Sequence, residues 1–175
     1  MGNAPACARE ALDMVRAGLG YLAAADATAM PAETQAWCLQ MLEQAHAIST
    51  AARTSVLAAF TSGQGYSADA DYSPRAWLIN RTRITKGAAV GYTAWVRRAA
   101  AHPEVAAALA AGQMSESFAR TICTWTDKLP EDCRPDADAI LLLAATSGAE
   151  LPDLGGLAGE IYAPVAARGA RQQAR

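Results

Sequence analysis

Six cationic side chains lie in a stretch of the chain that contains no acidic residue. Between Tyr72 and Pro103 the sequence has no aspartate or glutamate, whereas the whole chain has a formal net charge of −2. The cations of this stretch are Arg75, Arg81, Arg83, Lys86, Arg97 and Arg98. Guanidinium and ammonium groups without nearby acids attract phosphates, so this pattern indicates a nucleic-acid partner. The alternative interpretation is that these cations are solvated side chains on two surface helices.

The elements that would position the cations form a helix–turn–helix pattern. Ser73 can cap a helix that begins at Pro74 and ends near Arg81, because the N–H that proline lacks would be unpaired there. Thr85 can cap a second helix, predicted over 85–100 from apolar residues at helical spacing. In such a unit the second helix is the candidate reader of DNA.

A second pattern of the same kind follows directly. Pro103 is suited to open a short helix, and Gly112 is suited to end it in the left-handed conformation. Ser115 can then cap the next helix. The apolar stripe predicted for that helix consists of Phe118, Ala119, Ile122 and Trp125.

Apolar residues at helical spacing predict further helices on both sides of this pair. We expect them over 5–25, 31–61, 136–146 and from about 152 onward. The residues expected to face inward are Leu12, Val15, Leu19 and Leu22, then Trp37, Met41 or Leu42, Ala45, Ile48, Ala52, Val56 and Phe60, then Ile140 and Leu143, and finally Leu154, Leu157, Ile161 and Val165. The four tryptophans, Trp37, Trp77, Trp95 and Trp125, are interpreted as core residues rather than base-stacking platforms.

The fold class follows from these helices and from the composition. Hydrophobic residues make up 52% of the chain but aromatic residues only 6%, which favours closely packed helices over a sheet. We therefore predict an all-α, multi-helix bundle of about eight helices, with a long N-terminal spine helix and two consecutive helix–turn–helix units. It is expected as a single domain over 1–165, followed by a basic, disordered tail over 166–175.

Residues that commonly carry catalysis are few. His46 is predicted on the polar side of the long helix, and His102 at a helix boundary. A nucleophile activated by histidine also needs an orienting group and an oxyanion site, and nothing near His46 indicates either. We expect no catalytic residue. A third hypothesis is a hydrolase whose active site would include His46 and the aspartate pairs.

The acidic pairs and the cysteines indicate no bound metal or cofactor. Asp69 with Asp71, and Asp136 with Asp138, lack the further ligands of a cation site, so we interpret them as helix caps. The sequence has no glycine-rich phosphate-binding motif. The four cysteines form no C-x-x-C pair and are expected to be reduced, which suits a cytoplasmic protein. We see neither a signal peptide nor an apolar run long enough for a membrane span.

The segment from Ser73 to Ile122 resembles a known family, the 13E12-repeat family, whose domain is catalogued as domain of unknown function 222. The resemblance is carried by A-W-L at 76–78, A-A-V at 88–90 and H-P-E-V-A-A-A-L-A-A-G-Q-M-S-E-S-F-A-R-T-I at 102–122. It also includes A-A-R at 51–53 and L-L-L at 141–143. Members of that family occur mainly in actinobacteria and their phages, often ahead of an HNH endonuclease domain. The resemblance implies a DNA-binding or assembly module for a nuclease, but this chain has no HNH motif.

Two functions follow as expectations. The first is a non-enzymatic module that binds double-stranded DNA, with the six cations on phosphates and Asn80, Thr82 or Thr85 at base edges. The second is a protein-interaction module without DNA binding, in which the long helix 31–61 forms a homodimer or docks an HNH nuclease domain.

Overall fold

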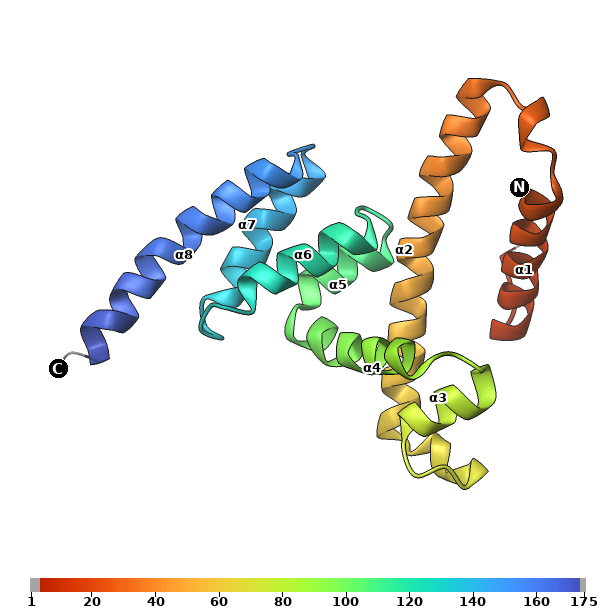
Figure 1. The fold of residues 1–175 in the computed structure, drawn as a ribbon, viewed down its shortest axis with the longest axis horizontal. Helices are drawn as coiled ribbons and strands as arrows, with labels where there is room; N and C mark the ends of the chain where they lie inside the picture. Colours follow the sequence, from red (N-terminus) through yellow and green to blue (C-terminus); the bar gives the residue numbers. More distant parts are fainter. Residues whose placement is uncertain (1–3, 174–175) are drawn as a thin grey trace. The chain divides into compact units, whose positions relative to one another are not determined.

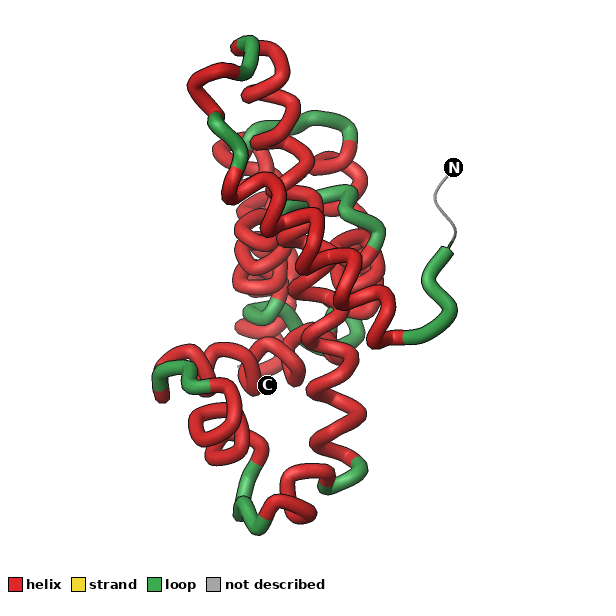
Figure 2. Tube along the Cα trace, turned by 90° about the vertical axis from the view of Figure 1, so that its right-hand side faces the viewer, coloured by secondary structure: helices red, strands yellow, loops and turns green. Residues whose placement is uncertain are grey.

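The computed structural model describes the backbone of residues 4–173 and the side chains as far as Ala163. This part of the chain contains eight α-helices and two short 3₁₀ turns, and no strand (Figures 1 and 2). The helices are α1 (Ala8–Ala24), α2 (Ala32–Ser62), α3 (Pro74–Thr82), α4 (Lys86–Ala101), α5 (Pro103–Ala110), α6 (Glu116–Thr126), α7 (Arg134–Thr146) and α8 (Leu151–Gln173). The predicted all-α fold of about eight helices is confirmed.

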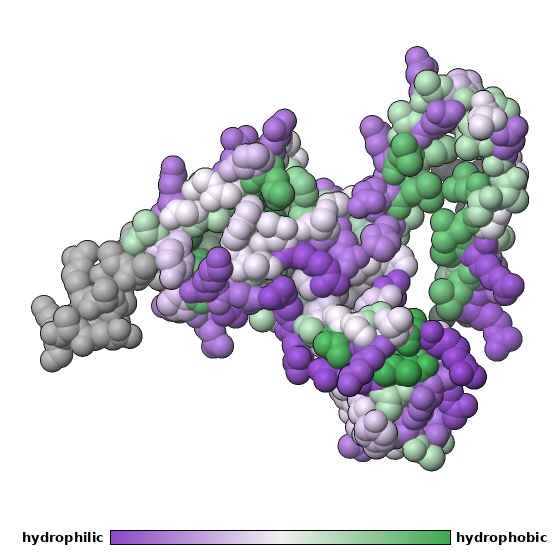
Figure 3. All heavy atoms as spheres, in the orientation of Figure 1, coloured by the Kyte–Doolittle hydropathy of each residue, from purple (hydrophilic) through white to green (hydrophobic). Residues whose placement is uncertain are grey.

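The chain divides into two compact units, and the single domain expected over 1–165 stays a prediction. The first unit is Met1–Met41 and the second is Leu42–Arg175, so the long helix α2 belongs to both. No described residue of the first unit is buried, and the apolar side chains of α1 are exposed at the surface of this unit (Figure 3). The backbone of α8 is helical as far as Gln173. The side chains of the predicted tail, 166–175, lie outside the described residues.

Side-chain caps fix where the helices of the second unit begin, as the sequence predicted. The hydroxyl oxygens of Ser73, Thr85 and Ser115 accept hydrogen bonds from the backbone N–H three residues on, at 3.1, 3.2 and 3.3 Å. Gly112 has a φ of +66°, which confirms its left-handed conformation after α5. A Cβ atom there would lie 2.6 Å from Gln44 Cγ on α2, so this turn also needs glycine for close packing.

The second unit contains two hydrophobic clusters. In the larger one α5, α6 and α7 pack against one another and α8 packs on α7 (Figure 1); Leu109, Ile122, Leu141 and Leu154 are almost completely buried there. The smaller cluster lies under α3 and α4. It consists of Leu57, Leu78 and Ala89, with partly buried residues packed around them. The α3–α4 hairpin therefore rests on this small cluster, while α4 also contributes Trp95 and Ala99 to the larger one.

Several of the predicted inward-facing stripes are wrong. On α2 the buried residues are Ala47, Thr50 and Leu57, whereas Ile48 and Val56 are 43% and 69% exposed. Small and polar residues line the packed face of α2 because neighbouring helices approach closely there and Thr50 has a hydrogen-bond partner. On α7, Leu141 is buried, whereas Ile140 and Leu143 are exposed.

Among the tryptophans and the other predicted stripes, some burial predictions are confirmed and others are wrong. Trp95 is a core residue, Trp77 and Trp125 are half-buried, and Trp37 is 59% exposed, so the core prediction is wrong for Trp37. The stripe of α6 is confirmed. The stripe predicted for α1 is exposed throughout.

Candidate nucleic-acid interface

The α3–α4 hairpin holds the six predicted cations on a rigid support. Arg83, with a φ of +59°, ends α3, and the cap at Thr85 starts α4 two residues later. Leu78 of α3 and Ala89 of α4 are buried against Leu57 of α2. Because both helices are anchored from below, their outer faces can present charged side chains in fixed positions.

Two of the six cations are paired with acids that lie outside the acid-free stretch. Arg81 Nη2 lies 3.1 Å from Asp69 Oδ1, and Arg98 Nε lies 2.8 Å from Asp127 Oδ2. An ion pair reduces the net charge that a partner would meet at that position. We therefore assign these two arginines a structural role.

The other four cations form no ion pair with any described residue. They are Arg75, Arg83, Lys86 and Arg97, and all four are exposed. Arg75 donates a hydrogen bond from Nε to Thr93 Oγ1 at 2.9 Å, which ties the start of α3 to the outer side of α4. We call these four residues the α4 basic face.

Helical geometry places two members of this face, Lys86 and Arg97, on the same side of α4. At 3.6 residues per turn, Lys86, Thr93 and Arg97 project from the same side of α4. Lys86 and Arg97 are separated along the helix axis by about 16 Å, at a rise of about 1.5 Å per residue. A major groove of B-DNA is about 12 Å wide, so the two ends of α4 could contact phosphates on opposite sides of a groove.

The start of α4 is also electrostatically unusual. Helices favour acidic residues in the first turn, where the helix dipole is positive, but α4 has none there and begins with Lys86. A cation at this end of a helix gains no stabilisation from the helix dipole. A phosphate at this end would meet the dipole, Lys86 and Arg83 together.

The three residues expected at base edges already have partners in the free chain. Asn80 donates from Nδ2 to Asp71 Oδ1 at 2.7 Å, and Thr82 donates to the carbonyl oxygen of Leu78 at 2.6 Å. Thr85 accepts the capping hydrogen bond but keeps its hydroxyl hydrogen available. No geometry here favours base reading over phosphate binding.

The acidic pairs predicted as helix caps have other roles. Asp69 accepts a hydrogen bond from Trp77 Nε1 at 2.6 Å in addition to its ion pair with Arg81. Together with Asp71 it anchors the loop before α3 to the outer side of that helix. Asp136 lies in the first turn of α7, but Asp138 is buried. The cap interpretation is therefore wrong for the first pair and for Asp138.

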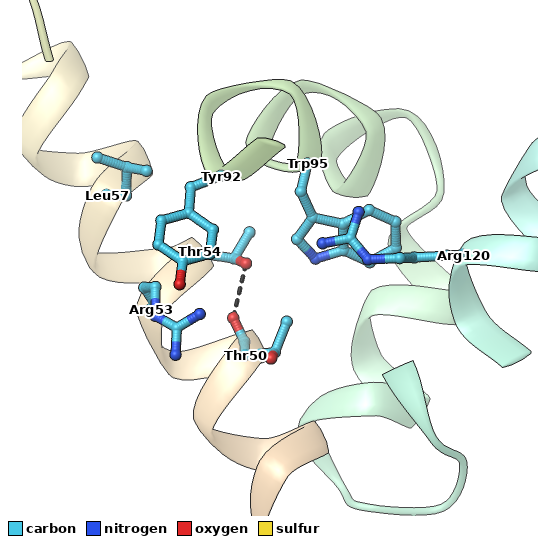
Figure 4. Close-up of a pocket in the computed structure, with 7 residues that line it drawn as sticks. All are labelled: Thr50, Arg53, Thr54, Leu57, Tyr92, Trp95 and Arg120. Carbon is cyan, nitrogen blue, oxygen red and sulfur yellow. Dashed lines mark hydrogen bonds between the residues drawn. The ribbon is translucent and has the colours of Figure 1, made fainter. Parts of the chain in front are cut away.

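A small hollow between α2, α4 and α6 lies beside the hairpin (Figure 4). The guanidinium carbon of Arg53 lies 4.5 Å from the ring centre of Tyr92, and that of Arg120 lies 4.4 Å from the ring centre of Trp95. The hollow has a volume of about 10 Å³, which is enough for one water molecule. These arginines cover the aromatic rings, so the rings are not platforms for stacked bases.

A buried polar network joins the α4–α5 junction to α6 and α7. His102 is completely buried at that junction, which confirms its predicted place at a helix boundary. Its Nδ1 lies 2.7 Å from Asp138 Oδ2 and its Nε2 lies 2.9 Å from Asp127 Oδ1. A carboxylate oxygen only accepts, so both contacts are satisfied when each ring nitrogen donates. Thr126 donates to Asp138 Oδ1 at 2.6 Å and completes the network.

The pKa values of two groups reflect the charges of this network: its member Asp127 and the neighbouring Cys123. Burial raises the pKa of Asp127, but the hydrogen bond from His102 and the charge of Arg98 outweigh it, so the pKa lies below its usual range. Burial, with the charge of Asp138 adding to it, raises the pKa of the Cys123 thiol to about 12. Cys123 is thus an unreactive core residue, and all four cysteines are free thiols.

The other histidine lies at the surface, as expected. His46 Nε2 lies 2.7 Å from Glu116 Oε2, which also accepts from Thr50 at 2.9 Å. Glu116 is in turn paired with Arg120 at 2.6 Å, so this cluster links α2 to the start of α6. The described residues contain no group of three potential metal ligands and no helix that is both long and apolar enough to cross a bilayer.

Comparison of the chain with protein-family models, curated proteins and solved structures finds no match. The fold and the site thus define a class, an all-helical module with an exposed basic hairpin. The resemblance to the 13E12-repeat family stays a proposal.

Proposed function

We propose that this chain is a non-enzymatic DNA-binding module of the 13E12-repeat type, and that the α4 basic face contacts the phosphates of double-stranded DNA. The observation that carries the proposal is a set of four exposed cations on one anchored helical hairpin, none of them paired with a described acid. The hairpin belongs to a chain whose net charge is −2, so its positive charge is local. Local positive charge of this kind favours a polyanionic partner.

The proposed site is narrower than the six cations of the sequence prediction. Arg81 and Arg98 are left out of the proposed site because each is already paired with an acid. Arg75, Arg83, Lys86 and Arg97 remain. An HNH nuclease domain is the partner that the family resemblance suggests for the module, and this part of the proposal rests on the resemblance alone.

Salt-dependent binding tests the proposal. Fluorescence anisotropy of a labelled random duplex should show binding at low salt, with log K falling by up to about 3.6 per log unit of salt if four phosphates are neutralised. Charge reversal of both Arg83 and Lys86 should weaken binding to all sequences alike and lower that slope by about 2. A parent chain that leaves the duplex unbound at low salt would contradict the proposal.

The second candidate function is a protein-interaction module that does not bind DNA. The exposed apolar side chains of α2, Ile48 and Val56 among them, favour it. Self-association of the chain, together with no DNA binding at low salt, would support this candidate over the first.

A further inference from the structure

The indole nitrogen of Trp95 is a buried hydrogen-bond donor that has no acceptor among the described residues. Trp95 is only 3% exposed, and its Nε1 makes no hydrogen bond to any described atom. Trp77 differs, because its Nε1 donates to Asp69 at 2.6 Å. Nearly all buried polar groups in native proteins have a partner, since an unpaired buried N–H has lost its hydrogen bond to water on folding. Trp95 Nε1 therefore needs an acceptor.

This nitrogen borders the small hollow between α2, α4 and α6. Figure 4 shows it on the side of the indole ring that faces Thr54 and Thr50 of α2, and all three residues line the hollow. The guanidinium of Arg120 covers the face of the ring, with its carbon 4.4 Å from the ring centre. The hollow is therefore the space in which an acceptor for Trp95 Nε1 can lie.

The two threonine hydroxyls beside the hollow already use their hydrogens elsewhere. Thr54 donates to the carbonyl oxygen of Thr50 at 2.7 Å (Figure 4), and Thr50 donates to Glu116 Oε2 at 2.9 Å. A hydroxyl has one hydrogen and two lone pairs, so both threonines can still accept but have no hydrogen left to donate. Neither oxygen is within hydrogen-bond distance of Trp95 Nε1.

A water molecule completes this pattern of one donor and two acceptors. It can accept from Trp95 Nε1 and donate to the hydroxyl oxygens of Thr54 and Thr50, and buried waters usually make two to four hydrogen bonds. The volume of the hollow, about 10 Å³, is that of a single water molecule.

A small anion fits the same hollow less well. Two guanidinium groups, those of Arg53 and Arg120, lie beside the hollow and would attract an anion. An anion only accepts hydrogen bonds, however, so it would face the lone pairs of both threonine hydroxyls. A halide ion is also larger than a water molecule. The hydrogen-bond pattern and the volume together favour water.

We propose that the hollow binds one ordered water molecule, which bridges Trp95 of α4 to Thr54 and Thr50 of α2. This bridge attaches α4 to α2 through hydrogen bonds, in addition to the hydrophobic contacts among Leu57, Leu78 and Ala89. It lies entirely within the second unit and does not depend on DNA binding.

A crystal structure of the full chain, determined from crystals soaked in sodium bromide, provides the first test. We expect electron density for one atom at about 2.7–3.2 Å from Trp95 Nε1. This atom should give no anomalous signal at the bromine absorption edge. An anomalous peak in the hollow would identify an anion and overturn the proposal. A map that shows other ordered waters but no density in the hollow would also overturn it.

The stability of two valine variants tests the bridge in solution. Thr54→Val removes an acceptor of the water and the hydrogen bond to the carbonyl oxygen of Thr50. Thr121→Val is the matched control, because Thr121 is also half-buried and donates to the carbonyl oxygen four residues before it, at 2.9 Å, but does not line the hollow. Loss of the bridge should lower the melting temperature of Thr54→Val by about 2–4 °C more than that of Thr121→Val. Equal shifts in the two variants would contradict the bridge to Thr54.

Discussion

The two consecutive helical hairpins of the second unit share a sequence pattern but differ in how their charges are used. Both open with a proline in the first turn, and both start their second helix at a hydroxyl cap. The α5–α6 hairpin has acidic residues at both helix starts, and its arginine, Arg120, is paired with Glu116 at 2.6 Å. The α3–α4 hairpin has no acid at either helix start, and most of its cations are unpaired.

Their supports differ as well. The α5–α6 hairpin belongs to the larger hydrophobic cluster, and the His102 network joins it to α7. The α3–α4 hairpin rests on a cluster with only three buried members, and it reaches the larger cluster only through Trp95 and Ala99 of α4. The same local pattern thus builds a core element in one hairpin and a charged outer surface in the other. Substitutions that affect the two hairpins differently can test this difference.

The largest effect is expected from His102→Ala in the network beside α5 and α6. The change leaves Asp127 and Asp138 without the ring that both contact, and breaking a buried charged pair costs about 3–5 kcal/mol. Urea denaturation should show this loss. The control is His46→Ala, which removes a surface ion pair whose histidine side chain is 54% exposed. This substitution should change the free energy of unfolding by less than about 1 kcal/mol. Equal effects at the two histidines would contradict the buried network.

A smaller effect is expected from a glycine in each hairpin. Gly112→Ala should destabilise the chain by at least about 1–2 kcal/mol, because φ is positive and the new Cβ would meet Gln44. Gly91→Ala, in the interior of α4 with open space around it, should instead stabilise the chain by about 0.5–1 kcal/mol. Thermal unfolding of the two variants should shift in opposite directions.

A pH-dependent effect of smaller size is expected at Asp127. Its folded-state pKa is lowered, so the stability it contributes is present above the unfolded-state value of about 3.9 and is lost as pH falls further. Asp127→Asn should therefore be less stable than the parent near neutral pH, and the difference should shrink below about pH 4. A difference that is constant across this range would show that the carboxylate charge of Asp127 does not contribute.

Local sequence signals predicted the elements well. The caps at Ser73, Thr85 and Ser115 and the left-handed Gly112 were predicted correctly, because each depends only on residues a few positions away. The helix bounds followed from the same signals to within a few residues. The division into two units could not be predicted, because local periodicity reports the apolar face of α1 but not the long-range contacts that define a unit.

The ion pairs within the candidate site could not be predicted from the sequence, for a physical reason. The acids that pair with Arg81 and Arg98 are 12 and 29 residues away in sequence, and both lie outside the acid-free stretch. Counting charges along the sequence therefore gives six free cations in this stretch, whereas in the folded chain only four of them have no described ion-pair partner. The buried partner of His102, Asp138, was also missed, since an aspartate near a helix start usually indicates a cap.

Phosphate binding by the α4 basic face is tested by a matched pair of lysine reversals, one in each hairpin region. Lys86→Glu removes one cation from the α4 basic face, while Lys128→Glu makes the same change at an exposed lysine after α6. The Lys86→Glu chain should keep its stability or gain about 0.3–1 kcal/mol, because an acid at the start of a helix suits the dipole. If the α4 basic face binds phosphates, Lys86→Glu weakens binding to a random duplex several-fold and lowers the salt slope by about 1, whereas Lys128→Glu changes neither. Equal binding by the two variants would contradict phosphate binding by this face.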